Sequence, residues 1–431
     1  MKILELTLHN FRGFSEKTLK LSEQFTLLIG DNGTGKTAIL DALAVGAGAL
    51  SLGIEAMDAR YIRPDEVRQI SYQLGQFPNL EPQYPVSVTC SGVLDGKRIN
   101  WVRSVDVEHG RTTRQNAKQI GKVAKRLQEQ VRSGSEVILP VVAYYPTGRL
   151  WLQKNEKSPK TLSPGSRTQG YVDCLDRASN EKLLMRWFKT MELTQLQERQ
   201  PVTVLSAAKK AVANCMEDWH QVQWEVKTDA LVAESDDGRL LPFRMLSDGV
   251  RNMLAMVVDI AYRMAVLNPQ MGADALAAPG LVLIDEIDLH LHPSWQRRIV
   301  EDLRRTFPNV QFVATTHSPF IVQSVRAGEL INLDGRCGEY AGKSIEDIAE
   351  DEMGVPVPQR SRRNEEMVEA AKKYYAALES GRQSNGQTLE QLKWRLDELL
   401  LPYRDDPAYV AFLEMQRAAA GLANGHHDAA G

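Results

Sequence analysis

The residues Gly30–Thr37 read GDNGTGKT, with glycines at the first and sixth positions followed by lysine and threonine. This is the spacing of a phosphate-binding loop between a strand and a helix. The glycines let backbone N–H groups turn inward around a phosphate, and the helix that follows adds its positive dipole end. Lys36 can reach the outer phosphates as a point charge, and the Thr37 hydroxyl can bind Mg²⁺. The stretch therefore predicts a nucleotide site.

The elements that must position this loop flank it directly. Phe25–Ile29 is a short apolar run of the strand type, and Ala38–Leu43 begins a helical pattern. A chance glycine-rich turn is the plain alternative. From average residue usage, the four fixed positions would match by chance in roughly one chain of this length in a hundred. The flanking strand and helix lower that chance further.

A second cluster with chemical potential lies in Leu281–His292, which reads LVLIDEIDLHLH. Its apolar residues predict a buried strand that delivers Asp285 and Glu286 to its C-terminal end, where α/β sheets bind ligands. One carboxylate can hold Mg²⁺, and its neighbour can accept a proton from an attacking water. Two acids at the end of a strand are common by themselves, but beside a phosphate loop they predict a hydrolytic site.

Two further stretches could face the same nucleotide. Leu246–Met253 reads LSDGVRNM before a long apolar helical pattern, so Ser247 and Gly249 mark a second helix N-terminus suited to an anion. An ordinary helix cap is the simpler interpretation. Val310–Thr316 predicts a strand that leads to His317, which could reach a γ-phosphate or could be a satisfied core histidine.

Paired histidines raise the alternative of a metal site. His290 and His292 lie two residues apart with Asp288 nearby, and no cysteine is close. Three separate strands or loops would be needed to complete such a site, so we do not expect these histidines to bind a metal.

Composition limits the function classes only loosely. The chain has 431 residues, enough for two or three domains, and its 43% hydrophobic and 25% charged residues are ordinary for a globular protein. Its net charge of −3 gives no global case for binding nucleic acid or membrane, so such a surface would be a local patch. The four cysteines form no CxxC pair, and no signal-peptide core or membrane-spanning segment stands out. We therefore expect a cytoplasmic protein.

The remaining chain predicts further elements. Ile3–Leu8 reads as a strand that leads to Arg12, and Tyr84–Leu94 and Arg98–Val107 read as a hairpin around Asp95-Gly96. Helical patterns follow in this order: Lys118–Val131, a helix capped by Asn180, Val204–Trp219, Asn364–Leu378 and Thr388–Leu400.

The helix over Lys118–Val131 carries the most basic region of the chain. Basic residues lie on its polar side and in the segments beside it: Arg111, Arg114, Lys118, Lys122, Lys125, Arg126 and Arg132. A solvated helix face is the plainer interpretation. Contact with nucleic acid is the alternative.

With these pieces in order, the sequence resembles the ABC-type ATPases of the SMC/RecF branch. The matching motifs are NFRGF, GDNGTGKT, LSDGV, LIDEIDLHLHP and TTHSP, between Asn10 and Pro319. The resemblance implies an α/β fold, an ABC-ATPase head with a mixed sheet, flanking helices and an antiparallel β subdomain. It implies four parts: an N-terminal lobe with the phosphate loop (1–150), a mainly helical insertion (151–240), a C-terminal lobe (241–340) and a helical partner-binding extension with a frayed tail (341–431).

The same resemblance implies roles within a dimer that sandwiches ATP and Mg²⁺. Thr37 and Asp285 would hold the metal, and the catalytic residues would be Lys36, Glu286 as activator of water, and His317 as sensor of the γ-phosphate. Ser247 and Gly249 would contact the nucleotide of the opposite subunit, and Asp288 would couple the two sites. The nucleotide-contacting residues would be Arg12, Gly30, Asn32, Gly33, Gly35, Lys36, Thr37, Ala38, Ser247, Gly249 and Asp288. No glutamine-loop residue follows Val137–Tyr145, where YYPTGR stands instead.

A finer resemblance concerns Tyr144–Trp151 (YYPTGRLW) and Ser344–Arg363, which look like the coil-less PtuA group of Septu and retron-associated antiphage defence. This implies an ATPase that dimerises around ATP and regulates a separate HNH nuclease of the PtuB type. A retron reverse transcriptase and its DNA–RNA hybrid are possible further partners. The chain shows no HNH pattern, so we expect no nuclease site of its own. The alternatives are a RecF-like repair or recombination ATPase and an ATP-dependent structural scaffold with little turnover.

Overall fold

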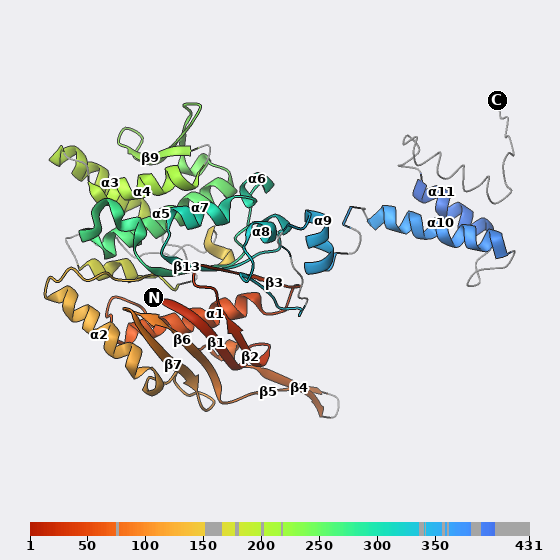
Figure 1. Cartoon of the computed structure of the whole chain (residues 1–431), viewed down its shortest axis with the longest axis horizontal. Helices are drawn as coiled ribbons and strands as arrows, with labels where there is room; N and C mark the ends of the chain where they lie inside the picture. The colour runs from red at the N-terminus through yellow and green to blue at the C-terminus, as the bar shows by residue number, and fades with distance from the viewer. Residues whose placement is uncertain are drawn as a thin grey trace. The chain divides into compact units, whose positions relative to one another are not determined.

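A computed structural model describes residues 1–74, 77–150, 166–176, 181–199, 202–216, 219–335, 340, 342–355, 358–359, 362–380 and 389–400. The chain divides into two compact units, Met1–Met353 and Gly354–Gly431. Figure 1 shows the helices and strands of both.

A five-stranded parallel sheet forms the centre of the first unit, in the order β14-β3-β13-β12-β8. Every residue of β3, β12 and β13 is buried, as expected for a parallel sheet that is covered on both faces. Because the five strands run in one direction, their carboxyl ends meet at one edge. The strands are β3 (Phe25–Ile29), β8 (Val141–Tyr145), β12 (Gly280–Ile284), β13 (Val310–Thr315) and β14 (Leu330–Asn332).

An antiparallel sheet in the order β2-β1-β6-β7 forms a second layer. Helix α1 (Lys36–Ala47) contacts strands of both sheets (Figure 1). The predicted hairpin is confirmed, because β6 and β7 pair on either side of Asp95 and Gly96, which both have the positive φ of a tight turn. The strands are β1 (Lys2–Phe11), β2 (Phe14–Lys20), β6 (Val86–Leu94) and β7 (Lys97–Val105), and β4 (Gln69–Leu74) pairs with β5 (Phe77–Pro82) in a separate ribbon.

Helices and a small sheet complete the first unit. The long helix α5 packs against α4 and contacts β8. The predicted helix over Val204–Trp219 is shorter in the structure, because α4 ends at Cys215 and Trp219 already belongs to β9. Asn180 lies outside the described residues. The helices are α2 (Lys118–Arg132), α3 (Glu181–Glu198), α4 (Thr203–Cys215), α5 (Asp248–Leu267), α6 (Pro293–Gln296), α7 (Ile299–Thr306), α8 (Pro319–Ser324) and α9 (Ile345–Asp347).

Two of the sheets were not predicted from the sequence: the β4-β5 ribbon and a three-stranded sheet. Strands β9 (Trp219–Glu225), β10 (Ala230–Ser235) and β11 (Leu240–Pro242) pair antiparallel in the order β11-β10-β9. Their sequence signal is present, since WHQVQWE alternates and a turn with Asp229 at positive φ follows. The predicted helix over Val204–Trp219 extended to the start of β9, so these short strands were not recognised.

The described residues of the second unit form two helices, α10 (Arg362–Ser380) and α11 (Leu389–Leu400), which confirm the two predicted C-terminal helices. They pack through a small apolar core of Met367, Ala371, Tyr374, Ala377, Leu392, Leu396 and Leu399. Across the described parts of both units, no helix has the length and apolar character needed to cross a membrane.

One buried side chain joins the two large sheets. Gln311 of β13 donates from Nε2 to the carbonyl oxygens of Ile3 and Ser22, each at 2.7 Å. Its Oε1 accepts the N–H of Ile3 at 2.8 Å. Gln311 is fully buried, so water cannot replace it at these three backbone groups.

We expect Gln311→Leu to lower the free energy of unfolding by at least about 2 kcal/mol, because it leaves three buried backbone groups without partners. Urea denaturation of the purified chain would measure the loss. The matched control is Gln119→Leu on the exposed face of α2, which should change stability little. Equal midpoints for the two variants would contradict the role assigned to Gln311.

Candidate functional site

The loop between β3 and α1 has the backbone of a phosphate cradle. Gly30, Gly33 and Gly35 have φ values of 149°, 88° and 97°, which disfavour other residues. A Cβ at Gly35 would also stand 2.5 Å from the ring of Phe14, so this position is closed to any side chain. The loop and the FRGF turn therefore pack in direct contact.

Lys36 begins α1 and turns its ammonium group back into the loop. Its Nζ donates to the carbonyl oxygens of Gly30 at 2.7 Å and Asp31 at 3.0 Å. Burial lowers the pKa of Lys36, and the nearby carboxylates, Asp334 foremost, oppose that shift. A phosphate placed in the loop would favour the charged lysine further and replace the two carbonyl acceptors.

Asp285 is the centre of the polar contacts. Its Oδ2 accepts hydrogen bonds from the hydroxyls of Thr37 at 3.0 Å and Thr147 at 2.9 Å. Its Oδ1 accepts from Thr315 at 2.7 Å. Thr37 and Asp285 are 248 residues apart in the sequence, so the fold joins the two residues expected to hold Mg²⁺. A hydroxyl and a carboxylate suit Mg²⁺, which takes its remaining ligands from phosphate and water.

Glu286 and His317 lie beside this cluster at the ends of β12 and β13. Glu286 has a positive φ of 48°, and its N–H donates to the Thr315 hydroxyl at 2.7 Å. This contact fixes the backbone of Glu286 to the neighbouring strand. His317 is exposed, which excludes the alternative of a core histidine.

One pocket of about 400 Å³ brings most of the expected residues together. This volume is in the range of small-ligand sites. Gly30 does not line the pocket but supplies a carbonyl to Lys36. The lining residues are Arg12, Gly13, Phe14, Asn32, Gly33, Thr34, Gly35, Lys36, Thr37, Ala38, Asp285, Glu286, Thr315 and His317.

Three expected residues, Ser247, Gly249 and Asp288, do not line this pocket. Ser247 is exposed at the start of α5, and its side chain accepts no capping hydrogen bond from the helix. Gly249 is buried, and a Cβ there would stand 2.2 Å from the carbonyl oxygen of His290. The start of α5 therefore packs directly on the turn that contains Asp288, whose Oδ1 accepts from Thr316 at 2.5 Å.

His292 has a structural role at the start of a helix. His292 precedes α6, and its Nδ1 lies 2.8 Å from the Ser294 hydroxyl and accepts the Ser294 N–H at 3.3 Å. Among the residues that the structure describes, no group of three or more His, Cys, Asp and Glu side chains is arranged to hold a metal ion.

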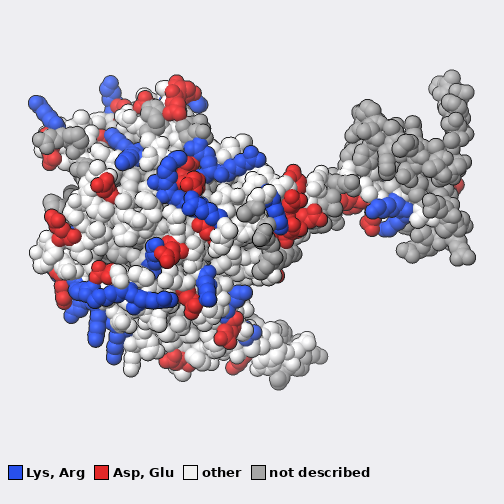
Figure 2. Space-filling view, viewed as in Figure 1, with Lys and Arg blue, Asp and Glu red and all other residues white. Residues whose placement is uncertain are grey.

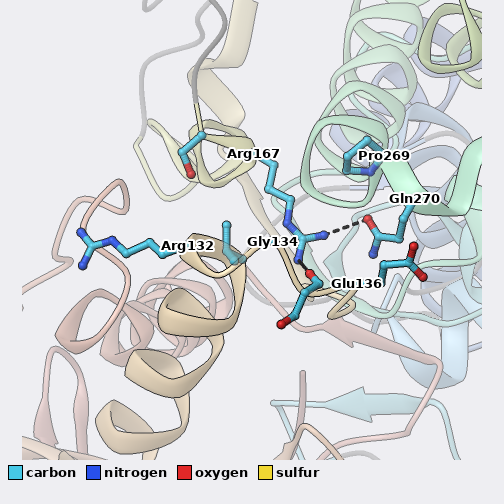
Figure 3. Close-up of a pocket in the computed structure, with 9 residues that line it drawn as sticks. Arg132, Gly134, Glu136, Arg167, Pro269 and Gln270 are labelled. Atoms are coloured by element: carbon cyan, nitrogen blue, oxygen red, sulfur yellow. Dashed lines mark hydrogen bonds between the residues drawn. The ribbon is translucent and has the colours of Figure 1, made fainter.

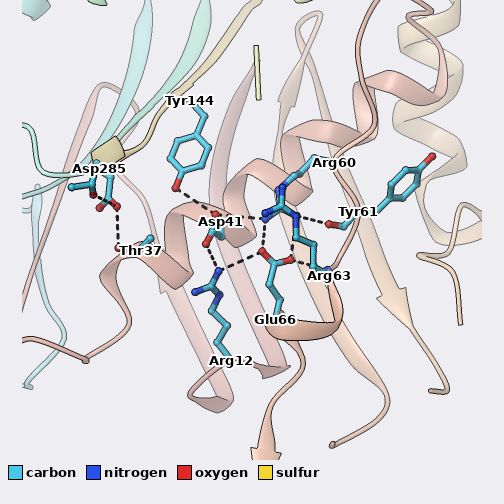
Figure 4. A network of polar contacts seen from close by, with 10 residues as sticks. Arg12, Thr37, Asp41, Arg60, Tyr61, Arg63, Glu66, Tyr144 and Asp285 are labelled. Carbon is cyan, nitrogen blue, oxygen red and sulfur yellow. Dashed lines mark hydrogen bonds and ion pairs between the residues drawn. The ribbon is translucent and has the colours of Figure 1, made fainter. Parts of the chain in front are cut away.

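Arg12 belongs to a buried network of charges (Figure 4). Its Nη2 donates to Oδ2 of Asp41 on α1 at 2.6 Å and lies 3.6 Å from Glu66. Arg60 pairs with the same two carboxylates, and the hydroxyl of Tyr144 reaches Asp41 at 3.4 Å. Asp41 and Glu66 are fully buried. Because a buried carboxylate needs its cation, this network fixes the FRGF turn to the helix of the phosphate loop.

Several residues that support the site were not predicted from the sequence, among them Thr315, whose hydroxyl donates to Asp285. Thr147 stands in the YYPTGR stretch, where no glutamine-loop residue was found, and its hydroxyl contacts Asp285. Asp334 follows β14 and accepts the N–H of Asp31 at 2.8 Å. Asp41 lies inside an otherwise apolar helix. For Thr147 and Asp334, the available signal was a polar residue at the second position after a parallel strand.

The chain is similar to known proteins over most of the residues that build this site. An AAA domain family model matches residues 5–218, and a second AAA domain model matches residues 166–323. The retron Vc95 probable ATPase of Vibrio cholerae serotype O1 biovar El Tor is 27% identical over 386 residues, which are 77% of this chain and 73% of that protein. The Septu protein PtuA of Bacillus thuringiensis is 30% identical over 196 residues, which are 41% of this chain and 47% of that protein. The chain is an ATPase related to the retron ATPases and to the Septu protein PtuA.

A solved SMC head bound to the C-winged helix domain of ScpA aligns with 75% of this ATPase and 93% of that chain, at 18% identity and a TM-score of 0.44. The α/β fold expected from the sequence, with flanking helices and an antiparallel subdomain, is confirmed by the topology of the chain itself. The described strands of the central sheet all pair in parallel, where a mixed sheet was expected.

We expect Thr147→Val to lower the rate of ATP hydrolysis by roughly tenfold, because a hydrogen bond to a charged group contributes about 1.5–3 kcal/mol. Thr147→Ser keeps the hydroxyl and should retain most activity. Steady-state phosphate release at several Mg²⁺ concentrations would measure both variants. Equal rates for the valine and serine variants would show that the hydroxyl is dispensable.

Proposed function

We propose that this ATPase binds ATP with Mg²⁺ between two copies of the chain and uses hydrolysis to regulate a partner nuclease in antiphage defence. The observation that carries the proposal is the 3.0 Å contact between Thr37 and Asp285, with Glu286 and His317 beside it in the same pocket.

The proposed roles follow from position. Thr37 and Asp285 would hold Mg²⁺, which neutralises charge on the β- and γ-phosphates. Lys36 would bind the outer phosphates after leaving its two carbonyl acceptors. Glu286 would accept a proton from the attacking water, and His317 would contact the γ-phosphate. Arg12, Asn32 and Ala38 would complete the contacts of the nucleotide within one subunit.

The proposed dimer would supply the remaining contacts. Ser247 and Gly249 do not line the pocket of their own chain, and the Ser247 side chain does not cap its helix. An exposed helix N-terminus with an available hydroxyl suits the γ-phosphate of a nucleotide held by the opposite subunit. Asp288 lies in the turn on which Gly249 packs. It would therefore couple the nucleotide site of its own subunit to that of the opposite subunit. ATP would then close the dimer, and hydrolysis would release it.

The dimer can be tested with Glu286→Gln, which should slow hydrolysis by about a hundredfold or more through loss of the general base. Light scattering after size-exclusion chromatography should show that ATP raises the mass of this variant to that of a dimer or higher homo-oligomer. The matched control is Glu286→Gln combined with Ser247→Arg, which should still bind ATP but should gain no mass. Hydrolysis by Glu286→Gln at the wild-type rate would refute the role of Glu286. An ATP-induced dimer in the double variant would refute the role of Ser247.

The proposed partner is an HNH nuclease of the PtuB type, with a retron reverse transcriptase and its DNA–RNA hybrid as further candidates. Support comes from the relatives, which are named as a retron ATPase and a Septu protein. We assign partner docking to the C-terminal helices. The second unit exposes Trp394 on α11 with 69% of its surface accessible, outside the apolar core that joins α10 and α11.

Partner docking can be tested by deleting residues from Gly354 onward, which spares the first unit. A tagged wild-type chain co-expressed with its neighbouring genes should co-purify with the nuclease, and the truncated chain should lose it while keeping ATPase activity. Trp394→Ala in the full chain should weaken the same association. Retained co-purification by the truncated chain would refute the docking assignment. Recovery of recombination proteins in place of a nuclease would favour the RecF-like alternative.

A further inference from the structure

A basic hollow of about 380 Å³ lies away from the nucleotide pocket. We define it by five of its lining residues, which are Tyr61, Arg114, Lys118, Lys122 and Lys125. The three lysines follow one another at i, i+4 and i+7 on α2, so they share a face of the helix. Figure 2 shows Lys and Arg side chains gathered over α2.

The shape of the hollow is fixed by backbone contact. A Cβ at Gly53 would stand 2.2 Å from the backbone nitrogen of Lys125, and a Cβ at Gly121 would stand 3.1 Å from Cβ of Leu52. Helix α2 therefore packs at close range on the turn at Leu52 and Gly53. Its lysine face cannot move away from that turn without loss of this packing.

Three of the four cations that define the hollow have no carboxylate partner among the described residues. Within the described parts of the chain, Arg114, Lys118 and Lys122 form no salt bridge, and Lys125 reaches only the exposed Glu129 at 3.9 Å. By contrast, the next residue, Arg126, pairs with Asp95. The helix thus neutralises a cation outside the hollow and leaves those inside it available.

Arg103 supplies the second and independent observation. It belongs to the inward face of β7, its side chain is fully buried, and none of its three guanidinium nitrogens has a hydrogen-bond partner. Burial lowers the pKa of Arg103. Two residues that line the hollow also act on this pKa: Tyr61 raises it and Arg114 lowers it. Arg103 does not itself line the hollow. A buried cation without a hydrogen-bond partner is nevertheless costly, and an anion nearby would offset that cost.

A second surface hollow provides the contrast (Figure 3). It also contains two arginines, but Arg132 pairs with Glu55 at 2.7 Å. Arg167 donates to Oε1 of Gln270 at 2.8 Å and to the carbonyl oxygen of Val137 at 2.8 Å. These arginines are already satisfied by the protein. The second hollow therefore does not need an anion to satisfy its arginines.

We propose that the basic hollow binds a backbone phosphate of single-stranded nucleic acid. The lysines from Lys118 to Lys125 span about 10 Å of helix, enough to contact more than one phosphate. Tyr61 is 45% exposed at the same site and offers a ring on which an unpaired base can stack. This proposal goes beyond ATP hydrolysis, because it gives the chain its own contact with a strand.

The first test is the binding of a fluorescent oligodeoxythymidine by anisotropy, with saturating ADP to occupy the nucleotide pocket. Lys118→Glu combined with Lys122→Glu should weaken binding by at least about tenfold and lower the slope of affinity against salt. The matched control is Lys20→Glu with Lys227→Glu, two exposed lysines with the same change in net charge. Equal loss in both double variants would overturn the proposal, since it would show a nonspecific charge effect.

The second test concerns Arg103, for which a purely structural role makes the opposite prediction. Arg103→Met removes an unpartnered buried cation, so the melting temperature should stay or rise while binding of the oligonucleotide weakens. A lower melting temperature with unchanged binding would overturn the proposal. ATPase rates without nucleic acid should be equal in all these variants, which separates this inference from the proposed ATP mechanism. If inorganic phosphate stabilises the wild type and no strand binds, the assignment to nucleic acid is wrong.

Discussion

The contacts of one buried carboxylate hold the site together. Asp285 accepts hydrogen bonds from the hydroxyls of Thr37, Thr147 and Thr315. Thr37 and Thr147 come after β3 and β8, and Thr315 is the last residue of β13. These strands lie in one parallel sheet, so their carboxyl ends can meet at a single residue. A change in the register of any strand would withdraw a hydroxyl and leave part of the carboxylate unsatisfied. The same cluster thus specifies the alignment of the sheet and prepares a site for a divalent cation.

A second constraint acts through α1, which carries Lys36 at its start and Asp41 one turn later. Asp41 is buried against Arg12 and Arg60, and Lys36 is bound by the loop that precedes the helix. Charges buried in this way tolerate little displacement, because each lost contact exposes a desolvated ion. The FRGF turn, the phosphate loop and the antiparallel sheet therefore act as one rigid support for the pocket.

Two polar side chains whose hydrogen-bonding groups are not used within the described protein lie where we assign contacts with other molecules. Ser247 stands at the start of a long helix without capping it. Arg103 is buried with no hydrogen-bond partner. Natural folds keep such departures where function requires them. The first suits a phosphate held by a second copy of the chain, and the second suits a phosphate of a nucleic-acid strand.

The sequence by itself determined the phosphate loop, the strand that ends in Asp285 and Glu286, and the long helices, because these follow from local spacing and periodicity. It also placed His317 after its strand. Only the tertiary structure decided that Thr147, Asp334 and Asp41 support the site, since each acts through a partner far along the chain. Strands β9 to β11 were missed because short strands depend on pairing more than on their own pattern. The charge of Arg103 became informative only when its burial was known, because no sequence pattern reports a missing partner.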